Sequence, residues 1–420
     1  MGTNRDFNNL INEYLPVSLM KEELIKRDYL LSKVDRDDTW TSGTIIVPFE
    51  GQHASSITFG SLEDVSEISK YKYVRGQVSS YKEAWSALRF EHRDLMEHSG
   101  KVNEKSFLKI LPNQVDDFIT YMKMAVSVNM MDGPHFATLT VSGTVAGELE
   151  VDRIDRLTID QKMVLDDGNS SPVTVYVISI DVNGGTLKNG VAVVSLTRGG
   201  VAADVSAYTV GAQDAKLYHV GAQAESFTSL SSQLLSAANG GGSQIFGQTK
   251  LLYPYLQAIQ YSGASISSTN LLSHLFAAYT KRQTHAKSGA LPEFLMSFKH
   301  FGTAIAQVET QKGGFNVAPN SRKASQYGWQ EITIGSVSGE FIKLVGVQEM
   351  TDSNIYCLDW SGITLYTNGF LQRRKAPDGL EYHSVRATTG YSYVLDHVLA
   401  GDIVVKNPWK QLIIHSIPAY

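Results

Sequence analysis

The segment 242–249 has the glycine and threonine spacing of a phosphate-binding loop. In that motif a lysine contacts the β- and γ-phosphates, and a strand leads into the loop. Here Gln248 occupies the lysine position, and the residues before the segment have a helical pattern. Without the ammonium group the loop lacks its main phosphate contact, so we interpret 242–249 as an ordinary glycine-rich connection.

Two histidines with neighbouring glutamates, His92 beside Glu91 and His98 beside Glu97, could be read as a metal site. Residues six positions apart on a helix are rotated by roughly 240° from each other. The two imidazoles therefore cannot share one ion from a single helix face. We interpret them as part of a solvated polar face.

The single cysteine, Cys357, lies in the apolar run 355–358 with no flanking cation to lower its pKa. A buried thiol of this kind is inert, so we expect a structural residue and not a nucleophile. One cysteine permits no intrachain disulfide, which indicates folding in a reducing compartment. His274 and His285 lack a nearby carboxylate and are also expected to be structural. The sequence therefore predicts no catalytic, metal or cofactor site, and no enzyme.

Two basic clusters remain, and their members are Lys281, Arg282, His285 and Lys287, and Arg373, Arg374 and Lys375. Such runs are usually a solvated helix end and a protected strand edge. The alternative, stronger for the second cluster, is contact with acidic surfaces of adjacent copies. The formal net charge of −5 and the pI of about 6.1 argue against a module that binds nucleic acid through its phosphates.

The composition predicts a folded chain of two or three compact units, because 420 residues with 43% hydrophobic residues can bury a core. Apolar runs such as 412–414 are too short to cross a bilayer. The start of the chain lacks the apolar region of a signal peptide. Asp6 stands where myristoylation needs Ser or Thr.

The elements that would position these residues begin with an arm over 1–39, which contains a short amphipathic helix capped by Ser18. Short β-prone runs at 44–49 and 57–59 predict a hairpin, and Pro48 marks its first strand as an edge. A hairpin with so little apolar surface is not stable alone. We therefore expect it to lie on a partner.

Helices are predicted over 78–98 and 111–131, and the second has apolar residues at helical spacing behind Pro112 at its start. That second helix would be roughly 30 Å long. From about 136 to 220 the pattern is β throughout, which favours a small inserted barrel or sandwich. Its candidate strands are 136–141, 149–151, 157–160, 173–181 and 191–197.

The remaining sequence predicts both helices and strands. The helices are 227–238, 250–260, 269–282 and 293–309, and the strands include 332–334 and 342–347. A second hairpin is predicted from 370–375 and 380–387, because Pro and Gly in the turn 376–379 suit a type I turn.

Two segments of the C-terminal third resemble a known protein family. Phe294, Leu295, Met296 and Ser297 precede a helix, as a buried strand does in that family. The run 345–350 followed by 355–359 resembles a strand, a loop and a strand that ends in Asp. With the order of arm, hairpin, long helix, β-rich insert and mixed region, the chain resembles the major capsid proteins of tailed double-stranded-DNA bacteriophages, which have the Hong Kong 97-like fold.

This resemblance implies an α+β fold with a defined set of parts. They are an N-terminal arm (1–39), an extended loop (40–78), a peripheral domain (79–135) with a spine helix (111–132), an inserted β-barrel-like module (136–210), an axial domain with peripheral strands (211–365), and a C-terminal hairpin with closing strands (366–420).

The resemblance also implies a function and partners. The chain would self-assemble into pentamers and hexamers of an icosahedral head that encloses double-stranded DNA without sequence-specific binding. Because it starts at the arm, a separate scaffolding protein is expected, together with portal and decoration proteins. It would fold and assemble in the host bacterial cytoplasm and reside in the virion capsid, without cofactor or membrane.

One departure from the family concerns covalent crosslinking. Some members join a loop lysine to an asparagine of a neighbour, but the tip 51–56 has no lysine, and Lys70 and Lys72 lie near the base. We therefore expect no crosslink. The alternatives are a β-rich phage tail, fibre or adhesin protein, and a hydrolase with an unfamiliar site. A bacterial encapsulin would share the fold class.

Overall fold

A computed structural model of the chain describes residues 16–40, 43–51, 73–78, 82–91, 104–141, 148–159, 161–168, 171–181, 191–195, 215–286, 292–310, 318–319, 329–335, 341–375, 380, 382–387 and 390–418. The chain divides into two compact units. Unit 1 combines Met1–Lys123 with Leu230–Tyr420, and unit 2 is Met124–Ser229. The protein is a mixed α+β protein, as predicted. The six-part division expected from the sequence is finer than these two units.

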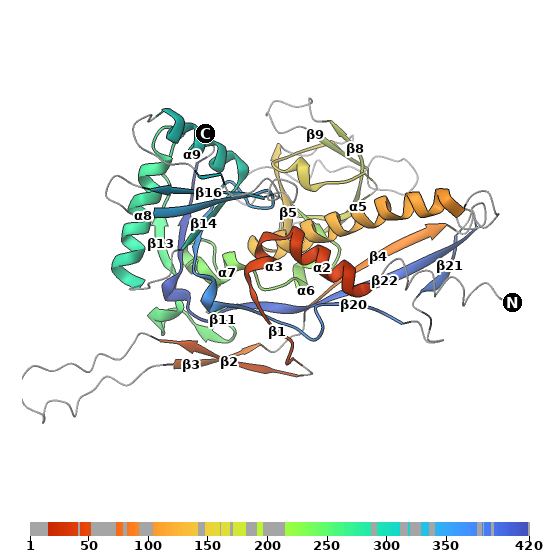
Figure 1. Cartoon of the computed structure of the whole chain (residues 1–420), viewed down its shortest axis with the longest axis horizontal. Coiled ribbons are helices and arrows are strands. Elements are labelled where there is room, and N and C mark those ends of the chain that lie inside the picture. Colours follow the sequence, from red (N-terminus) through yellow and green to blue (C-terminus); the bar gives the residue numbers. More distant parts are fainter. Residues whose placement is uncertain are drawn as a thin grey trace, which may run out of the picture. The chain divides into compact units, whose positions relative to one another are not determined.

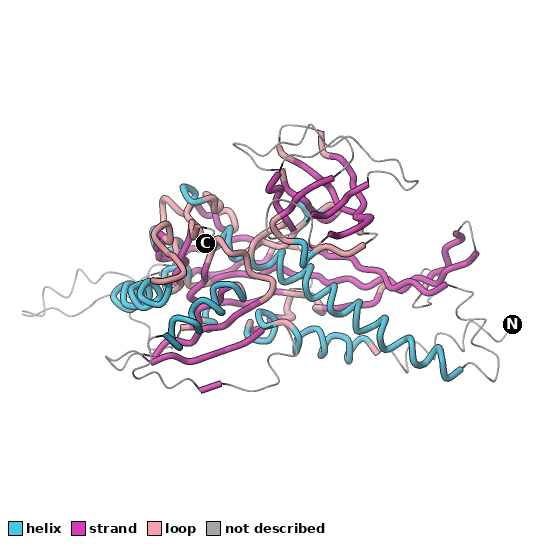
Figure 2. The backbone as a smooth tube through the Cα atoms, turned by 90° about the horizontal axis from the view of Figure 1, so that it is seen from above, coloured by secondary structure: helices cyan, strands magenta, loops and turns pink. Residues whose placement is uncertain are grey.

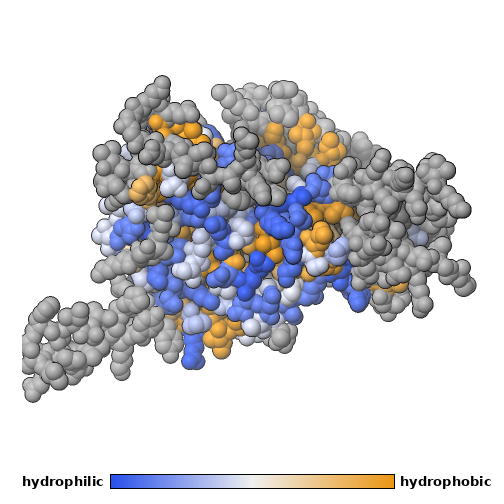
Figure 3. All heavy atoms as spheres, in the orientation of Figure 1, coloured by the Kyte–Doolittle hydropathy of each residue, from blue (hydrophilic) through white to orange (hydrophobic). Residues whose placement is uncertain are grey.

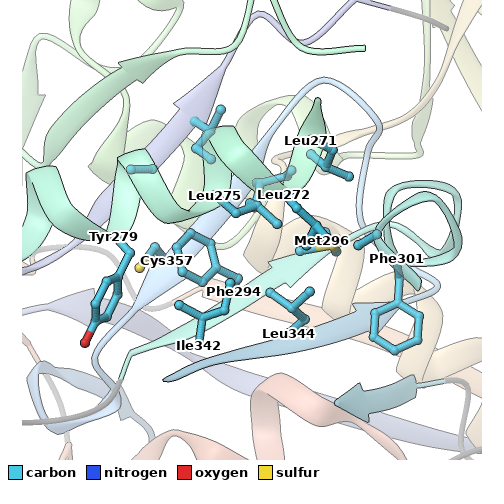
Figure 4. Close-up of a cluster of buried hydrophobic side chains, with 14 of the residues drawn as sticks. Leu271, Leu272, Leu275, Tyr279, Phe294, Met296, Phe301, Ile342, Leu344 and Cys357 are labelled. Carbon is cyan, nitrogen blue, oxygen red and sulfur yellow. The ribbon is translucent and has the colours of Figure 1, made fainter. Parts of the chain in front are cut away.

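A seven-stranded mixed sheet forms the main core of unit 1. In spatial order its strands are β13 (Ile259–Ser262), β23 (Leu412–His415), β18 (Ile355–Leu358), β14 (Glu293–Met296), β17 (Phe341–Val347), β16 (Trp329–Gly335) and β15 (Ala318–Pro319). The helices α8 (Leu271–Ala286) and α9 (Phe298–Thr310) pack against it. Figure 4 shows leucines of α8 meeting Phe294 and Met296 of β14. Both faces of β14 and β18 are buried, which explains their continuous apolar sequences.

A second sheet of unit 1 is built around one long strand. Its strands are β1 (Asp35–Asp37), β19 (Ile363–Tyr366), β22 (Gly390–Val405), β20 (Leu371–Arg373), β21 (His383–Ala387) and β4 (Lys82–Glu91). Among the described residues, β20 and β21 pair with successive parts of β22 and not with each other. The predicted hairpin of 370–375 with 380–387 is therefore wrong, and its turn 376–379 lies outside the described residues. The hairpin observed here is β21 with β22.

The prediction of a helix over 78–98 is wrong for its described residues, because Val78 ends β3 (Tyr73–Val78) and 82–91 form the strand β4. Its residues alternate, with Leu88 and Phe90 buried and Trp85 and Arg89 exposed. It pairs along its whole length with β22. Lys, Glu and Ala favour helices, but pairing with a distant strand overrides that preference.

The long helix α5 (Glu104–Met131) begins seven residues before the predicted 111–131. Pro112 therefore stands inside the helix and not at its first turn. The N-terminal helices α2 (Val17–Arg27) and α3 (Tyr29–Lys33) lie near the part of α5 that belongs to unit 1 (Figures 1 and 2). The cap of α2 is Pro16, without a side-chain hydrogen bond, so Ser18 is not the cap. Residues 1–15 of the predicted arm lie outside the described residues.

A two-stranded sheet pairs β2 (Ile45–Glu50) with β3 (Tyr73–Val78). The predicted partner strand 57–59 lies outside the described residues. In the described residues Val47 lies opposite Gly76 and Pro48 opposite Arg75.

The segment 230–262 departs most from the predicted helices. It contains α7 (Leu230–Leu234), η3 (Ala237–Asn239), β11 (Gln244–Ile245), β12 (Gln248–Thr249), η4 (Pro254–Leu256) and β13. The helix predicted over 227–238 shortens to α7, and that over 250–260 is wrong. There β13 pairs in parallel with β23 from Ile259 onward. Helix 269–282 is confirmed as α8, while 293–309 divides into β14 and α9.

Unit 2 is a closed barrel with its own apolar core. Its strands in order are β10 (Lys216–His219), β5 (His135–Val141), β6 (Glu148–Val151), β9 (Val191–Ser195), β8 (Val173–Asp181) and β7 (Lys162–Asp166). The short helix α6 (Ala222–Glu225) follows β10. The strand predicted over 157–160 is wrong for its described residues, which follow the turn η2 (Ile154–Arg156). Through β10 the barrel extends past the predicted boundary at residue 210.

Candidate interaction surface

The β2–β3 sheet has one face buried against unit 1. Val47, Phe49 and Val78 are buried in a cluster with Trp40, Ile245, Leu256, Tyr366 and Val404. The Phe49 ring stacks on Phe246, with ring centroids 6.3 Å apart. A Cβ atom at Gly76 would overlap the Phe49 ring, so only glycine allows this approach. The inner face is therefore a packed contact.

Backbone hydrogen bonds fix both strands to the same unit. The Gln77 N–H donates to the Phe246 carbonyl (2.9 Å), and the Gln248 side-chain amide donates to the Arg75 carbonyl (2.8 Å). On the other strand, the Trp409 indole N–H donates to the Glu50 carbonyl (3.1 Å). The base of this sheet is thus held at several points.

The outer face of the same sheet is open among the described residues. Ile46 is 57% exposed, and Pro48, Arg75 and Gln77 are also exposed. This sheet has only two strands in the described part of the chain, and its open face carries an apolar residue. Such a sheet can pair or pack with another chain. We define Ile46, Pro48, Arg75 and Gln77 as the ribbon face.

Two exposed leucines lie in the turn after β12. Leu251 is 83% exposed and Leu252 is 70% exposed. The preceding Lys250 is buried, and its Nζ donates to the carbonyls of Ser232 (2.8 Å) and Leu235 (2.7 Å). Burial lowers the pKa of Lys250 to about 8. This anchored lysine fixes the turn, so the leucines point outward. Sequence reasoning missed them because it placed 250–260 in a helix.

The expected glycine-rich connection at 242–249 is a small hairpin of β11 and β12. Phe246 and Gly247 form its turn with positive φ angles of 45° and 81°. The Gln248 amide is engaged by the Arg75 carbonyl, and the following Lys250 is turned inward. Neither side chain is arranged to hold a phosphate.

A third open region is one face of the sheet around β22. Trp85 is 52% exposed, and the Arg374 guanidinium lies 5.2 Å from its ring centroid. The opposite face is covered, since Phe118 of α5 packs on His397 with ring centroids 5.2 Å apart. Trp and Arg are residues that often anchor protein interfaces. Figure 3 shows hydrophobic residues scattered among hydrophilic ones on the described surface of one face.

The basic cluster 373–375 is partly engaged within the chain. Arg373 is half-buried, with its Nε 3.4 Å from the His397 ring and a guanidinium nitrogen 4.0 Å from the Met20 sulfur. Arg374 covers Trp85, and Lys375 is exposed. Contact of this cluster with acidic surfaces of adjacent copies stays a prediction.

The cluster 281–287 is a solvated helix end at Lys281 and His285, which are exposed, but Arg282 departs from that expectation. Arg282 is fully buried, its Nε donates to the Lys410 carbonyl (2.7 Å), and its guanidinium lies 3.6 Å from Asp359. The Lys281 Nζ donates to the Gln260 carbonyl (2.8 Å). Lys287 lies outside the described residues.

The remaining histidines of the sequence analysis have structural contacts where they are described. His274 is hydrogen-bonded to the Tyr261 hydroxyl (2.9 Å), and a ring nitrogen of His285 lies 2.8 Å from the Lys281 carbonyl. His92, His98 and Glu97 lie outside the described residues, as do Lys70 and Lys72. Glu91 ends β4.

Cys357 is fully buried in β18, and burial raises the pKa of its thiol to about 12. The thiol is therefore protonated at neutral pH, and the expected burial of Cys357 is confirmed. In the described part of the chain, no group of three or more His, Cys, Asp or Glu side chains could hold a metal ion. None of the described helices is long and apolar enough to cross a membrane.

No protein-family model and no curated protein matches the chain. It is similar to solved structures of low sequence identity. The cyanophage A-1(L) capsid asymmetric unit is 10% identical, with a TM-score of 0.42, and the match covers 92% of this chain and 90% of that chain. The capsid of a native GTA particle is 9% identical, with a TM-score of 0.45. That match covers 93% of this chain and 90% of that chain.

The procapsid of satellite phage P4, which includes a size determination protein, is 10% identical, with a TM-score of 0.42. That match covers 100% of this chain and 98% of that chain. All three are capsid or procapsid structures.

Proposed function

We propose that the chain is the major shell subunit of a tailed-phage-type capsid with the Hong Kong 97-like fold. Many copies would assemble into pentamers and hexamers of a closed icosahedral head that encloses double-stranded DNA. Residues 1–39 would act as the arm, 40–78 as the extended loop, and α5 as the spine helix.

The ribbon face is the observation that carries this proposal. The β2–β3 sheet is anchored on one side by Phe49 and Gly76, while Ile46 on the other side is exposed. A single isolated hairpin is marginal in water, so a sheet held open in this way is suited to contact with a neighbouring chain. The exposed Leu251 and Leu252 offer a second contact on the same unit.

Repeated contacts of this kind favour closed shells. Contacts between different surfaces of identical subunits form rings when their rotation closes. Each contact is modest, but several per subunit reinforce one another, as in multivalent binding. During maturation, the arm and loop would rearrange while the folded units move as rigid bodies. Residues 52–72 that contact only their own subunit in an expanded shell would contradict this rearrangement.

The proposed partners follow from the same function. A separate scaffolding protein would guide assembly, and portal and decoration proteins would complete the head. The net charge of −5 suits enclosure of DNA without sequence-specific binding. Assembly would take place in the host bacterial cytoplasm, without membrane or cofactor.

The rival structural function is a β-rich tail, fibre or adhesin protein. It predicts almost no helix, whereas α5 has 28 residues, α8 has 16 and α9 has 13. The hydrolase alternative has no described constellation of side chains in its favour. Neither rival is supported by a specific observation.

The direct test is replacement of 52–72 by a short Gly-Ser linker. Because the base of the sheet is anchored within unit 1, the variant should remain folded by circular dichroism. It should nevertheless fail to form rings or shells in negative-stain micrographs under conditions in which the parent assembles. A control with 52–72 replaced by a Gly-Ser segment of equal length separates loop length from loop side chains. Shells formed equally well by all three chains would refute the proposed role of the loop.

A further inference from the structure

Glu293, the first residue of β14, joins four side chains from three segments: α3, β17 and the turn η6 (Trp360–Gly362). Its Oε2 accepts hydrogen bonds from the Tyr29 hydroxyl (2.5 Å) and the Trp360 indole N–H (2.6 Å). Its Oε1 accepts from the Nζ of Lys343 (2.7 Å) and of Lys33 (3.4 Å). Glu293 is only 8% exposed, so this carboxylate depends on these partners in place of water.

The positive and negative charges around Glu293 are equal in number, but only Lys343 contacts both carboxylates. Lys343 also pairs with Glu331 (2.9 Å), so two cations face two carboxylates. Burial raises the pKa of Glu293, but hydrogen bonds from Lys343, Tyr29 and Trp360 outweigh it and hold the pKa below its ordinary value. Burial, followed by the Glu293 charge, raises the pKa of Tyr29, which keeps its hydroxyl a donor.

Two of the four partners belong to the helix pair, which we define as α2 and α3. The pair is short, 11 and 5 residues, and helices of this length are marginal without tertiary contacts. Met20 and Leu24 of α2 are buried, and Arg27 forms an ion pair with Asp116 of α5. At its C-terminal end, Tyr29 and Lys33 tie the pair to Glu293. Leu30 and Leu31 of α3 are buried as well, so the helix pair is held by apolar packing together with these polar contacts.

We propose that Glu293 is a charged anchor that holds the helix pair on the seven-stranded sheet, and that loss of its charge releases the pair while the sheet stays folded. The two lysines that bind Glu293 differ in their other contacts, and this difference explains why the helix pair and not the sheet would be released. Lys343 keeps Glu331 when Glu293 is neutral. Lys33 instead keeps only its contact with the Tyr29 ring, 5.5 Å away, among the contacts described for it.

The anchor is a property of the single chain and does not depend on the proposed function. It would connect the charge of one buried carboxylate to the attachment of the helix pair.

The test is hydrogen–deuterium exchange of the full chain, parent against Glu293→Gln. Amides of 17–34 should exchange at least tenfold faster in the variant, while those of β14 and β18 should change by less than twofold. Glu349→Gln is the matched control, because Glu349 forms another buried ion pair in the same unit, with Lys123 at 2.8 Å. It should leave 17–34 as protected as in the parent. Equal protection of 17–34 in parent and Glu293→Gln, or sheet opening together with the helix pair, would overturn the proposal.

A second variant covers the case in which Glu293→Gln does not fold. Lys33 is 34% exposed, so Lys33→Met removes one partner without burying a new polar group. It should raise exchange of 17–34 severalfold and leave β14 unchanged. A helix pair as protected in Lys33→Met as in the parent would count against the anchor.

Discussion

At the level of single residues, Gly76 shows how closely the β2–β3 sheet packs on unit 1. Substitution Gly76→Ala places a methyl group where the Phe49 ring now lies. The ring must move out of a packed cluster, so we expect a loss of about 1–3 kcal/mol in the free energy of unfolding. Urea denaturation of the parent and the variant measures this difference.

Gly302→Ala is the matched control for that substitution. Gly302 lies within α9, and a Cβ there would meet no atom within 4 Å. Alanine should therefore be neutral or stabilise the helix by up to ~1 kcal/mol. If Gly76→Ala unfolds at the same urea concentration as Gly302→Ala, the sheet is not packed as described.

His397 should make the stability of unit 1 depend on pH. Burial, assisted by Arg373, lowers the pKa of His397 to about 4 from the ordinary 6.5. The unfolded chain therefore takes up this proton near pH 6.5, while the folded chain does so only near pH 4. The contribution of neutral His397 is complete above pH 6.5 and is lost as the pH falls toward 4.

The measurement compares urea unfolding at pH 7 and pH 5 for the parent and His397→Leu. The interval from 6.5 to 5 corresponds to about 2 kcal/mol, since one pKa unit is about 1.4 kcal/mol. The parent should lose that much more stability than the leucine variant over this range. Identical pH dependence in the two proteins would exclude His397 as the titrating group.

Single residues also show where prediction from sequence ends. The burial of Cys357 could be predicted because an apolar run surrounds it. The hydrogen bonds of Glu293 and Lys250 could not be predicted, because their partners come from elsewhere in the chain. Tyr29 lies 264 positions from Glu293. The carbonyls that accept from Lys250 belong to Ser232 and Leu235, which are 18 and 15 positions away. Polar residues acquire these roles only through tertiary packing.

At the level of elements, periodic patterns over long segments were reliable and local propensity was not. The helix predicted over 269–282 and the strand predicted over 173–181 correspond to α8 and β8. In contrast, 78–98 contains helix-forming residues, yet β4 pairs with β22 more than 300 positions away. The Pro and Gly of 376–379 also led to a wrong prediction of a hairpin, because both flanking strands pair with β22 and not with each other.

The barrel of unit 2 makes an element-scale prediction. Its strands close on themselves, and Leu149, Met163 and Leu217 lie in a core of its own. A fragment of residues 124–229 should therefore fold without the remainder of the chain. Cooperative thermal unfolding and a dispersed amide NMR spectrum would be the expected result.

Two substitutions in that fragment test whether the core is the one described. Leu149→Ala should cost about 2–5 kcal/mol, because Leu149 is fully buried. Ile159→Ala should change stability by less than about 0.5 kcal/mol, because Ile159 is 61% exposed. A fragment that is unfolded, or equal effects of both substitutions, would contradict an independent barrel.

At the level of the whole molecule, the order of elements carried more information than any motif. The chain holds a helix pair, an anchored ribbon, a long helix and an inserted barrel, followed by a mixed sheet with two helices. None of these has a catalytic constellation in its described residues, whereas several exposed apolar groups remain for contact with other chains. The proposed shell function gives these open surfaces a purpose.

The most direct test of this account is electron microscopy of the purified full chain over a range of concentrations, with and without a scaffolding protein. We expect rings of five and six subunits and closed shells, with the ribbon face of each subunit covered by a neighbour. A chain that stays monomeric in every condition, with Ile46 and Leu251 still solvent-exposed, would contradict the account.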